Sequence, residues 1–306
     1  MFARIQKLRD SLKRKEYKRL SYLIRLLFSL ALLYWIFRQI DLGAAFAQAS
    51  HLPWGIILGL MLLSGFRHFI QFQNWRCALH LNPAYKYHAK EVAASYLIAL
   101  PLRFALPGGH ASFAKVFYLK NSSILASLIS TTSERLFMTW STWTFAAMAA
   151  YFSFPQMSLP LRLLMVVFSA FMPLWAALIM ASRPAWRQYV PAFGVQAPRM
   201  MLLQIANTLI MYLQYHLILN VLGRISAIGT WLSMALTNIS NSIPITISGL
   251  GLREGFAIHF LEVWGFSSEQ AVATTLSLFF FQDVVPALVW AVVLLRAKRP
   301  TGLTKP

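Results

Sequence analysis

Long apolar runs with few charges are the feature that most limits what this chain can fold into. Of its 306 residues, 58% are hydrophobic and only 12% are charged, whereas a soluble domain carries about 25% charged residues. A helix that crosses the hydrocarbon core of a bilayer needs ~20 consecutive apolar residues, so the composition leaves room for roughly six to eight crossings. The sequence therefore predicts an all-α polytopic membrane protein and excludes a soluble enzyme.

Basic residues gather before the first apolar run and after the last one. The chain carries 28 Lys and Arg against 9 Asp and Glu, which gives a net charge of +19. Basic residues beside membrane spans mark cytoplasmic ends and attract anionic lipid, so we expect a lipid partner rather than nucleic acid. We predict basic cytoplasmic segments at residues 1–22 and 297–306, with a single transmembrane domain over 23–296.

Metal and nucleotide chemistry have no support in the sequence. Its one cysteine, Cys77, excludes an internal disulfide, a cysteine-based zinc site and an iron–sulfur cluster. The 7 His never fall in the HxxxH or HExxH spacing of metal sites, and no phosphate-binding GxxxxGK[ST] loop is present. We therefore expect no metal, no cofactor and no ATP hydrolysis by this chain.

The order of apolar and charged segments predicts an unusual topology. Loop 67–90 is basic and expected to be cytoplasmic, whereas loop 153–160 has no charge and is expected to be external. Both loops keep these sides only if segment 91–121 enters the membrane and returns to the side from which it came. The same reasoning makes 227–262 a re-entrant hairpin that is entered from the outside. We expect about six full transmembrane helices plus two re-entrant helical hairpins, the alternative being ordinary kinked helices. The apolar segments are 23–37, 52–66, 91–106, 122–152, 161–182, 200–222, 227–247 and 271–295.

The two predicted hairpins also resemble each other in sequence. PLRFALPGGHASFAKVF, which starts at Pro101, and PITISGLGLREGFAIHF, which starts at Pro244, share five identical residues over 17 positions at a constant offset of 143. Opposed, discontinuous segments in two halves of a chain are typical of inverted-repeat transporters, whose binding site lies near the bilayer midplane. We therefore predict an inverted repeat that relates residues 23–152 to 161–295.

Ionisable residues inside the predicted spans are candidate functional residues, because a charge in the bilayer costs several kcal/mol. Each hairpin contains a glycine-rich bend that is expected to open a new helix, and the amides of a helix N-terminus suit a phosphate. Arginine side chains would add charge-assisted donors. The candidate substrate-binding residues are Arg103, Gly108, Gly109, His110, Glu134, Arg135, Gly249, Gly251, Arg253, Glu254 and Asp283.

The same charges could instead serve only the fold. The pairs Glu134–Arg253 and Arg135–Glu254 would neutralise them, as would a contact of Asp283 with either arginine. Uncharged polar residues inside the later spans could likewise line a pathway or form interhelical hydrogen bonds. These residues are Asn207, Gln214, His216, Asn238 and Asn241.

Two classes of membrane enzyme match the sequence less well. Residues 107–110 (PGGH) are similar to the PSGH element of membrane lipid phosphatases, but the KxxxxxxRP and SRxxxxxH elements of that chemistry are missing. A lipid-linked glycosyltransferase would need clustered acidic residues in an external loop, whereas Asp41, Glu262 and Glu269 are isolated. We therefore expect a protein without enzymatic activity.

Several motifs occur in an order that is similar to one known family. They are Pro-Gly-Gly at 107–109, Ser-Glu-Arg at 133–135, and Pro244 followed by GLGLRE at 249–254. Together they resemble the lysylphosphatidylglycerol synthase transmembrane family, over roughly residues 20–296. The family often has an acidic residue shortly after Glu-Arg, where this chain reads Leu-Phe-Met at 136–138, so a pairing role for such an acid is in doubt. No soluble aminoacyl-transferase domain is expected, and the resemblance implies lipid translocation rather than lipid lysylation.

We therefore expect a multi-pass lipid translocase of the bacterial inner membrane, with both termini cytoplasmic. It would hold an anionic or lipid-linked head group while the acyl chains stay in the lipid, and a second copy of the chain is a possible partner. Protonation of Glu134, Glu254 or Asp283 could couple transport to a proton gradient, with passive scrambling as the alternative. Two other functions stay open: an enzyme acting on a lipid-linked sugar or phosphate, and a non-catalytic partner of a lipid or glycan biosynthesis complex.

Overall fold

The computed structural model describes most of the chain between the two basic ends. Its described residues are 47, 50, 52–105, 113, 115–119, 123–243 and 251–296. The terminal segments 1–22 and 297–306 and the expected span 23–37 lie outside them. Four candidate site residues also lie outside, and only the backbone of Arg103 is described. The four are Gly108, Gly109, His110 and Gly249.

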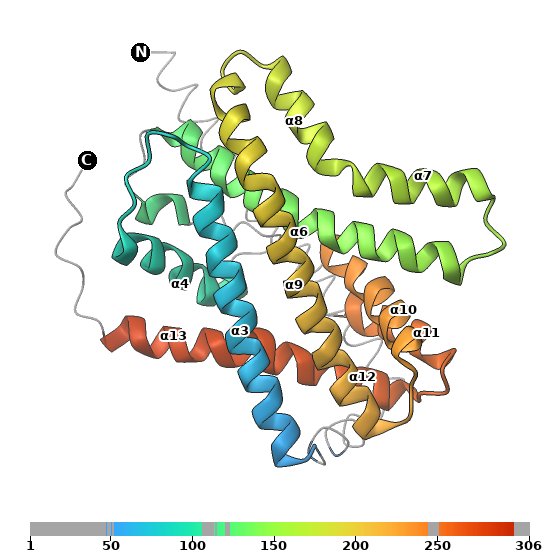
Figure 1. The fold of residues 1–306 in the computed structure, drawn as a ribbon. Coiled ribbons are helices and arrows are strands. Elements are labelled where there is room, and N and C mark those ends of the chain that lie inside the picture. Colours follow the sequence, from blue (N-terminus) through green and yellow to red (C-terminus); the bar gives the residue numbers. More distant parts are fainter. Residues whose placement is uncertain are drawn as a thin grey trace, which may run out of the picture.

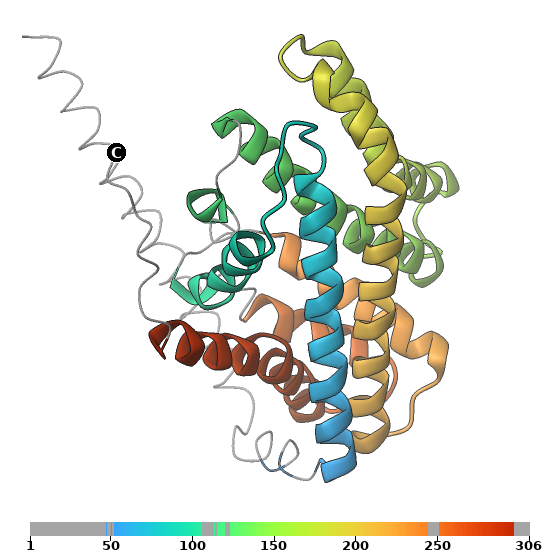
Figure 2. The same ribbon diagram turned by 60° about the vertical axis from the view of Figure 1, so that its left-hand side comes forward.

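Three long helices form the frame of the described part, which is helical and contains no strand. They are α3 (Trp54–Leu79), α6 (Ile124–Ser153) and α9 (Val190–Leu222). Helices α3 and α9 run side by side in both views, and α6 packs against each of them (Figures 1 and 2). The prediction of an all-α protein is confirmed for these residues.

Three helical stretches in the described part are long and apolar enough to cross a membrane: Trp54–Leu79, Arg187–Leu222 and Ser268–Trp290. A fourth candidate is the pair α7 (Leu159–Ala170) and α8 (Met172–Ser182), which is bent by 58°. The bend has a cause in the sequence, because Pro173 lies just after it and a proline removes one helical hydrogen bond. The expected span over 161–182 is therefore bent near its middle, and the count of six full spans stays a prediction.

Two predicted boundaries were wrong because helices continue past them. Helix α3 extends from the expected span 52–66 through residue 79, so Arg67 lies inside it rather than in a cytoplasmic loop. The charge is tolerated there because its guanidinium donates hydrogen bonds to neighbouring helices, as described below. Helix α9 likewise starts ten residues before the expected span 200–222. An expected loop, 153–160, is a turn between α6 and α7.

The segments predicted to be re-entrant are short and broken. The first contains α4 (Ala89–Ala105) and η1 (Lys115–Tyr118). The second contains α10 (Ala227–Asn238), η3 (Ile239–Ser242) and α11 (Leu252–Glu262). Helices α10 and α11 pack on each other, and at 1.5 Å per residue each is about 16–18 Å long, well short of the ~30 Å hydrocarbon core. Their re-entrant arrangement and the inverted repeat stay predictions.

The last predicted span, 271–295, is a continuous helical run with an irregular centre. It consists of α12 (Ser268–Phe279), a π-helical turn η4 (Phe280–Val284) and α13 (Val285–Arg296). Pro286 explains the irregularity, because it has no N–H to donate to the carbonyl of Gln282 four residues earlier. Single π turns of this kind are frequent at functional sites.

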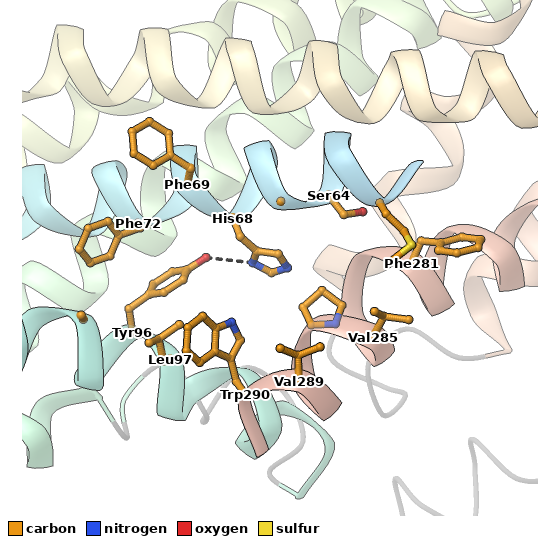
Figure 3. Close-up of a pocket in the computed structure, with 14 residues that line it drawn as sticks. Ser64, His68, Phe69, Phe72, Tyr96, Leu97, Phe281, Val285, Val289 and Trp290 are labelled. Atoms are coloured by element: carbon orange, nitrogen blue, oxygen red, sulfur yellow. Dashed lines mark hydrogen bonds between the residues drawn. The ribbon is translucent and has the colours of Figure 1, made fainter. Parts of the chain in front are cut away.

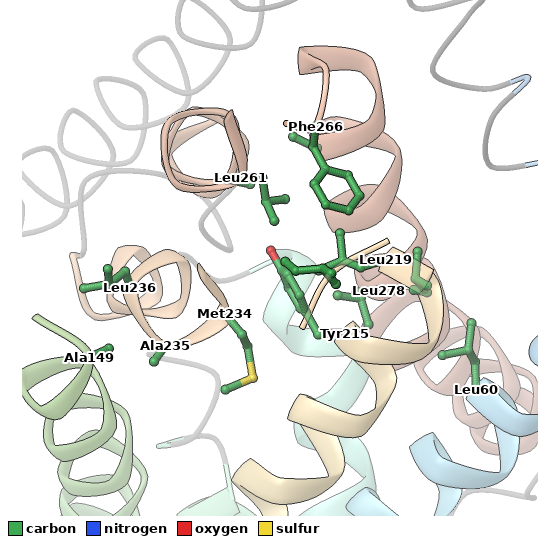
Figure 4. Packing of buried hydrophobic residues seen from close by; sticks show 14 of the residues in the cluster. Leu60, Ala149, Tyr215, Leu219, Met234, Ala235, Leu236, Leu261, Phe266 and Leu278 are labelled. Atoms are coloured by element: carbon green, nitrogen blue, oxygen red, sulfur yellow. The ribbon is translucent and has the colours of Figure 1, made fainter. Parts of the chain in front are cut away.

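Two clusters of buried apolar side chains hold these helices together. One joins Tyr215 of α9, Met234 of α10, Leu261 of α11 and Leu278 of α12 (Figure 4). The other contains Trp75 of α3 together with side chains of α6 and α9. Outward-facing positions carry large exposed apolar residues instead, as expected where the surface meets lipid. Members of both clusters line the cavity that follows.

Candidate functional site

A polar cavity of about 390 Å³ lies among the helices of the described part, within the size range of small-ligand sites. Its charged lining combines side chains from α3, η1, α6, α11 and η4. Four of the predicted site residues meet there: Glu134, Arg135, Arg253 and Asp283. The sequence-based prediction missed two further cations of the lining, Arg67 and Lys115.

The first charged group of the cavity is an ion pair between Lys115 and Glu134. The Lys115 ammonium donates to both carboxylate oxygens of Glu134, at 2.6 and 2.7 Å. It also lies over the rings of Trp75 and Tyr96, 4.5 and 5.2 Å from their centroids. Both charges are almost fully buried, at 5% and 2% exposure, so each stabilises the other in a poorly solvated place.

The second charged group is built by the start of α11. Gly251 has a φ of 84°, a conformation that only glycine adopts readily, and the helix begins at the next residue. Glu254 then folds back: its Oε2 accepts from the Gly251 N–H at 2.6 Å, and its Oε1 accepts from Arg253 Nη2 at 2.6 Å. Arg253 also lies over the Phe279 ring, 5.0 Å from its centroid.

This geometry corrects two expectations. The bend at Gly251 does open a new helix, but its N-terminus is occupied by the carboxylate of Glu254 rather than left open for a phosphate. The pairs Glu134–Arg253 and Arg135–Glu254 are not formed; each glutamate has a different cationic partner. The reason is proximity, because Arg253 adjoins Glu254 in the chain and folding places Lys115 against Glu134.

Polar side chains of α3, α9 and η4 form a hydrogen-bond network through the α3–α9 seam. Arg67 donates to Asn207 Oδ1 at 3.2 Å and to Gln282 Oε1 at 2.6 Å. Gln282 donates to Gln214 Oε1 at 2.7 Å, and Gln214 donates to Ser64 Oγ at 2.9 Å. Each of these hydrogen bonds joins two different elements, so the network fixes the two long helices to each other and to the π turn. Asn207 and Gln214 therefore form interhelical hydrogen bonds, and Asn207 also lines the cavity.

The spacing of polar residues along α3 and α9 is the sequence pattern that indicates this network. On α3 the polar residues Ser64, Arg67, Gln71 and Asn74 recur every three or four positions within an otherwise apolar helix. On α9, Gln204 lies three and four positions before Asn207 and Thr208, and Gln214 lies seven positions, about two helical turns, after Asn207. Such stripes place polar groups on one face of each helix. The two faces meet in the structure, where Gln71 and Gln204 also exchange hydrogen bonds at 3.3 and 3.2 Å.

The charges around the cavity leave an excess of one positive charge among the described residues. The cations are Arg67, Lys115, Arg135 and Arg253, and the anions are Glu134, Asp283 and the Glu254 that pairs with Arg253. No group of three or more His, Cys, Asp or Glu side chains that could hold a metal occurs in the same part of the chain. A cavity of this kind is suited to bind a group with one negative charge.

Comparison with protein families gives the cavity a context. Residues 22–289 match the family described as the lysylphosphatidylglycerol synthase TM region. The chain belongs to this family. Comparison with curated proteins found no match. Every charged residue of the cavity lies within the matched range, so the site is part of the membrane region that defines the family, and the protein is a membrane protein related to lipid biosynthesis or lipid flipping.

Proposed function

We propose that this chain is a lipid translocase that moves an anionic or lipid-linked head group between the leaflets of a membrane. The observation that carries the proposal is a polar cavity with one excess positive charge among the described residues, lined in part by helices long and apolar enough to span a bilayer. Such a cavity lowers the cost of moving a charged head group through hydrocarbon, where an unpaired charge is strongly disfavoured. Membership of the family supports the same function.

The charge of the cavity favours a particular kind of head group. Two of its cations, Lys115 and Arg253, already have carboxylate partners at 2.6 Å. The other described charges of the lining are Arg67, Arg135 and Asp283, so the excess of one positive charge belongs to the lining as a whole. A phosphodiester carries one negative charge and would balance this excess, with arginine offering paired N–H donors to its oxygens.

The wider setting of this function follows from the sequence. We place the protein in the bacterial inner membrane as a multi-pass protein with both termini in the cytoplasm, because the terminal segments are basic. Membrane lipids are its proposed partners, and a second copy of the chain is another. Transport would be driven either by protonation of a cavity carboxylate or by passive exchange, and the chain would act without changing the lipid chemically.

The test is head-group transfer in proteoliposomes made from phosphatidylglycerol with a fluorescent head-group label. Arg135→Gln removes one cavity cation, and hydrogen bonds to charged groups contribute about 1.5–3 kcal/mol, so transfer should fall roughly 10–100-fold. Arg183→Gln is the matched control, because Arg183 is exposed at the end of α8 and away from the cavity. Arg253→Ala is a poorer probe, since it would strand the fully buried Glu254.

The outcomes separate the candidate functions. Equal transfer by wild type and Arg135→Gln, with both shown to be folded, would refute the role of the cavity. A wild type that transfers neither phosphatidylglycerol nor a polyprenyl phosphate would refute the translocase. Mass spectrometry of the recovered lipid covers the remaining case, because a changed lipid mass would identify an enzyme.

A further inference from the structure

An apolar groove of about 430 Å³ lies beside the polar cavity, between α3, α4 and the η4–α13 segment (Figure 3). Its walls are almost entirely hydrocarbon and include Phe69 and Phe72 of α3, Leu97 of α4, and Val289 of α13. Phe69 and Val289 are 54% and 52% exposed. The groove therefore opens on the outer surface of the helices, where a membrane protein meets the hydrocarbon of the bilayer.

Two residues line both the groove and the polar cavity, and they mark the place where the two meet. These are His68 of α3 and Tyr96 of α4. His68 Nε2 lies 3.1 Å from the backbone carbonyl of Gln282, and His68 Nδ1 lies 3.1 Å from the Tyr96 hydroxyl. A carbonyl only accepts, so Nε2 carries a proton and donates to it, while Nδ1 is hydrogen-bonded to the Tyr96 hydroxyl.

The backbone carbonyl that accepts from His68 lies in the π turn, just before Pro286. It belongs to Gln282, whose helical partner would be the N–H of residue 286, and that residue is proline. The side chain of Gln282 meanwhile binds Arg67 of the cavity. One residue of the π turn thus connects the boundary of the groove with the charged lining of the cavity.

The length of the groove fits one hydrocarbon chain. Along α3 it runs from Met61 to Phe72, which is about 16 Å at a rise of 1.5 Å per residue. One leaflet occupies half of the ~30 Å hydrocarbon core. The groove therefore extends about as far along α3 as one leaflet is thick.

We propose that this groove holds one acyl chain of the translocated lipid while the phosphate of the same lipid occupies the polar cavity, with His68 and Tyr96 at the junction between head group and chain. This proposal rests on the proposed function and adds the path by which the lipid stays in contact with the bilayer. It assigns the substrate class as a phospholipid with at least one extended hydrocarbon chain, rather than a soluble phosphate.

A pair of glycines on α3 allows a matched test. Gly65 lines the groove, and a Cβ placed on it meets nothing within 4 Å, so Gly65→Phe fills the groove without a clash at its base. Gly59 on the same helix is equally open at Cβ and does not line the groove, so Gly59→Phe is the control. Both changes replace a helical glycine by a better helix former, which favours folding of both variants.

The experiment measures directly whether an acyl chain occupies the groove. Each protein is reconstituted into vesicles that contain phosphatidylglycerol with a diazirine at the end of one acyl chain, and adducts are mapped by mass spectrometry after illumination. We expect adducts on the groove-lining peptides of α3 and α13 in wild type and in Gly59→Phe, and at least a fivefold loss in Gly65→Phe. Adducts spread evenly over exposed helix faces, or unchanged by Gly65→Phe, would overturn the proposal.

A transfer assay on the same vesicles keeps the two proposals distinguishable. We expect Gly65→Phe to slow transfer at least tenfold and Gly59→Phe to change it less than twofold. If the wild type transfers lipid and Gly65→Phe changes neither transfer nor labelling, the proposed acyl-chain site in the groove is refuted. The translocase proposal would still stand. Groove labelling without any transfer by wild type would refute the translocase and leave the groove as a lipid-binding site.

Discussion

Replacing Lys115 with methionine would leave the Glu134 carboxylate without the cation that neutralises it. Glu134 is 2% exposed, and its oxygens accept from the Lys115 ammonium at 2.6 and 2.7 Å. Removing one partner of a buried ion pair costs about 3–5 kcal/mol, because the remaining charge stays desolvated. We expect Lys115→Met to lower the free energy of unfolding by that amount, while the methionine stem still packs against Trp75.

The double variant Lys115→Met with Glu134→Gln tests the reasoning. It removes both charges, so most of the lost stability should return and the coupling energy of the pair should exceed about 2 kcal/mol. The assay is equilibrium unfolding in mixed detergent micelles, applied to the wild type, both single variants and the double variant.

A matched control comes from α7. Arg162 lies over the Tyr151 ring at 5.0 Å and donates to the Tyr151 carbonyl, so Arg162→Met removes a similar cation without stranding a carboxylate. We expect Arg162→Met to lower the free energy of unfolding by only about 1 kcal/mol. A double variant no more stable than Lys115→Met would refute the view that an unpaired Glu134 is the source of the cost.

Three further predictions concern the bends and the junction. Gly251→Ala should lower the free energy of unfolding by about 1–2 kcal/mol, measured in the same micelles, because φ is 84° there. Pro286→Ala supplies an N–H that competes with His68 for the Gln282 carbonyl, so it should raise thermal stability while slowing lipid transfer in proteoliposomes. Tyr96→Phe removes the hydroxyl that is hydrogen-bonded to His68 but keeps the ring under Lys115, so it should cost about 1 kcal/mol in micelle unfolding, and Tyr96→Leu should cost more.

Each of these has a result that would contradict it. An unchanged stability in Gly251→Ala would mean that the bend relaxes to an ordinary conformation. Unchanged transfer in Pro286→Ala would show that the carbonyl of Gln282 has no part in transport. Equal losses in the two Tyr96 variants would show that the ring contributes nothing to holding the Lys115 ammonium.

Much of the fold could be predicted from the sequence because hydrocarbon imposes a strict rule. Backbone groups in a bilayer must be hydrogen-bonded within the chain, so long apolar runs become helices, and the runs at 122–152 and 200–222 did so with shifts at their ends. The glycine-rich bend before α11 was also predictable, since Gly251 occupies a φ that disfavours other residues. The bend of 58° between α7 and α8 follows from Pro173, a helix-breaking residue inside the apolar segment 161–182.

The candidate site was predictable only in part. Glu134, Arg135, Arg253 and Asp283 do line one cavity, because charged residues inside apolar helices are driven to face protein rather than lipid. Arg67 was assigned to a loop instead, since a basic residue at the end of an apolar window looks the same whether the helix ends there or continues. Its partners lie 140 and 215 residues away in the chain.

The sequence by itself thus determined that this protein is helical, belongs in a membrane and carries ionisable residues within its apolar segments. Composition and local backbone preferences are sufficient for those conclusions. Only the tertiary structure decided that Lys115 rather than Arg253 neutralises Glu134, and that His68 lies between a polar cavity and an apolar groove. Ion pairs and cavities depend on which helix faces meet, and that is set by packing over the whole chain rather than by any local run of residues.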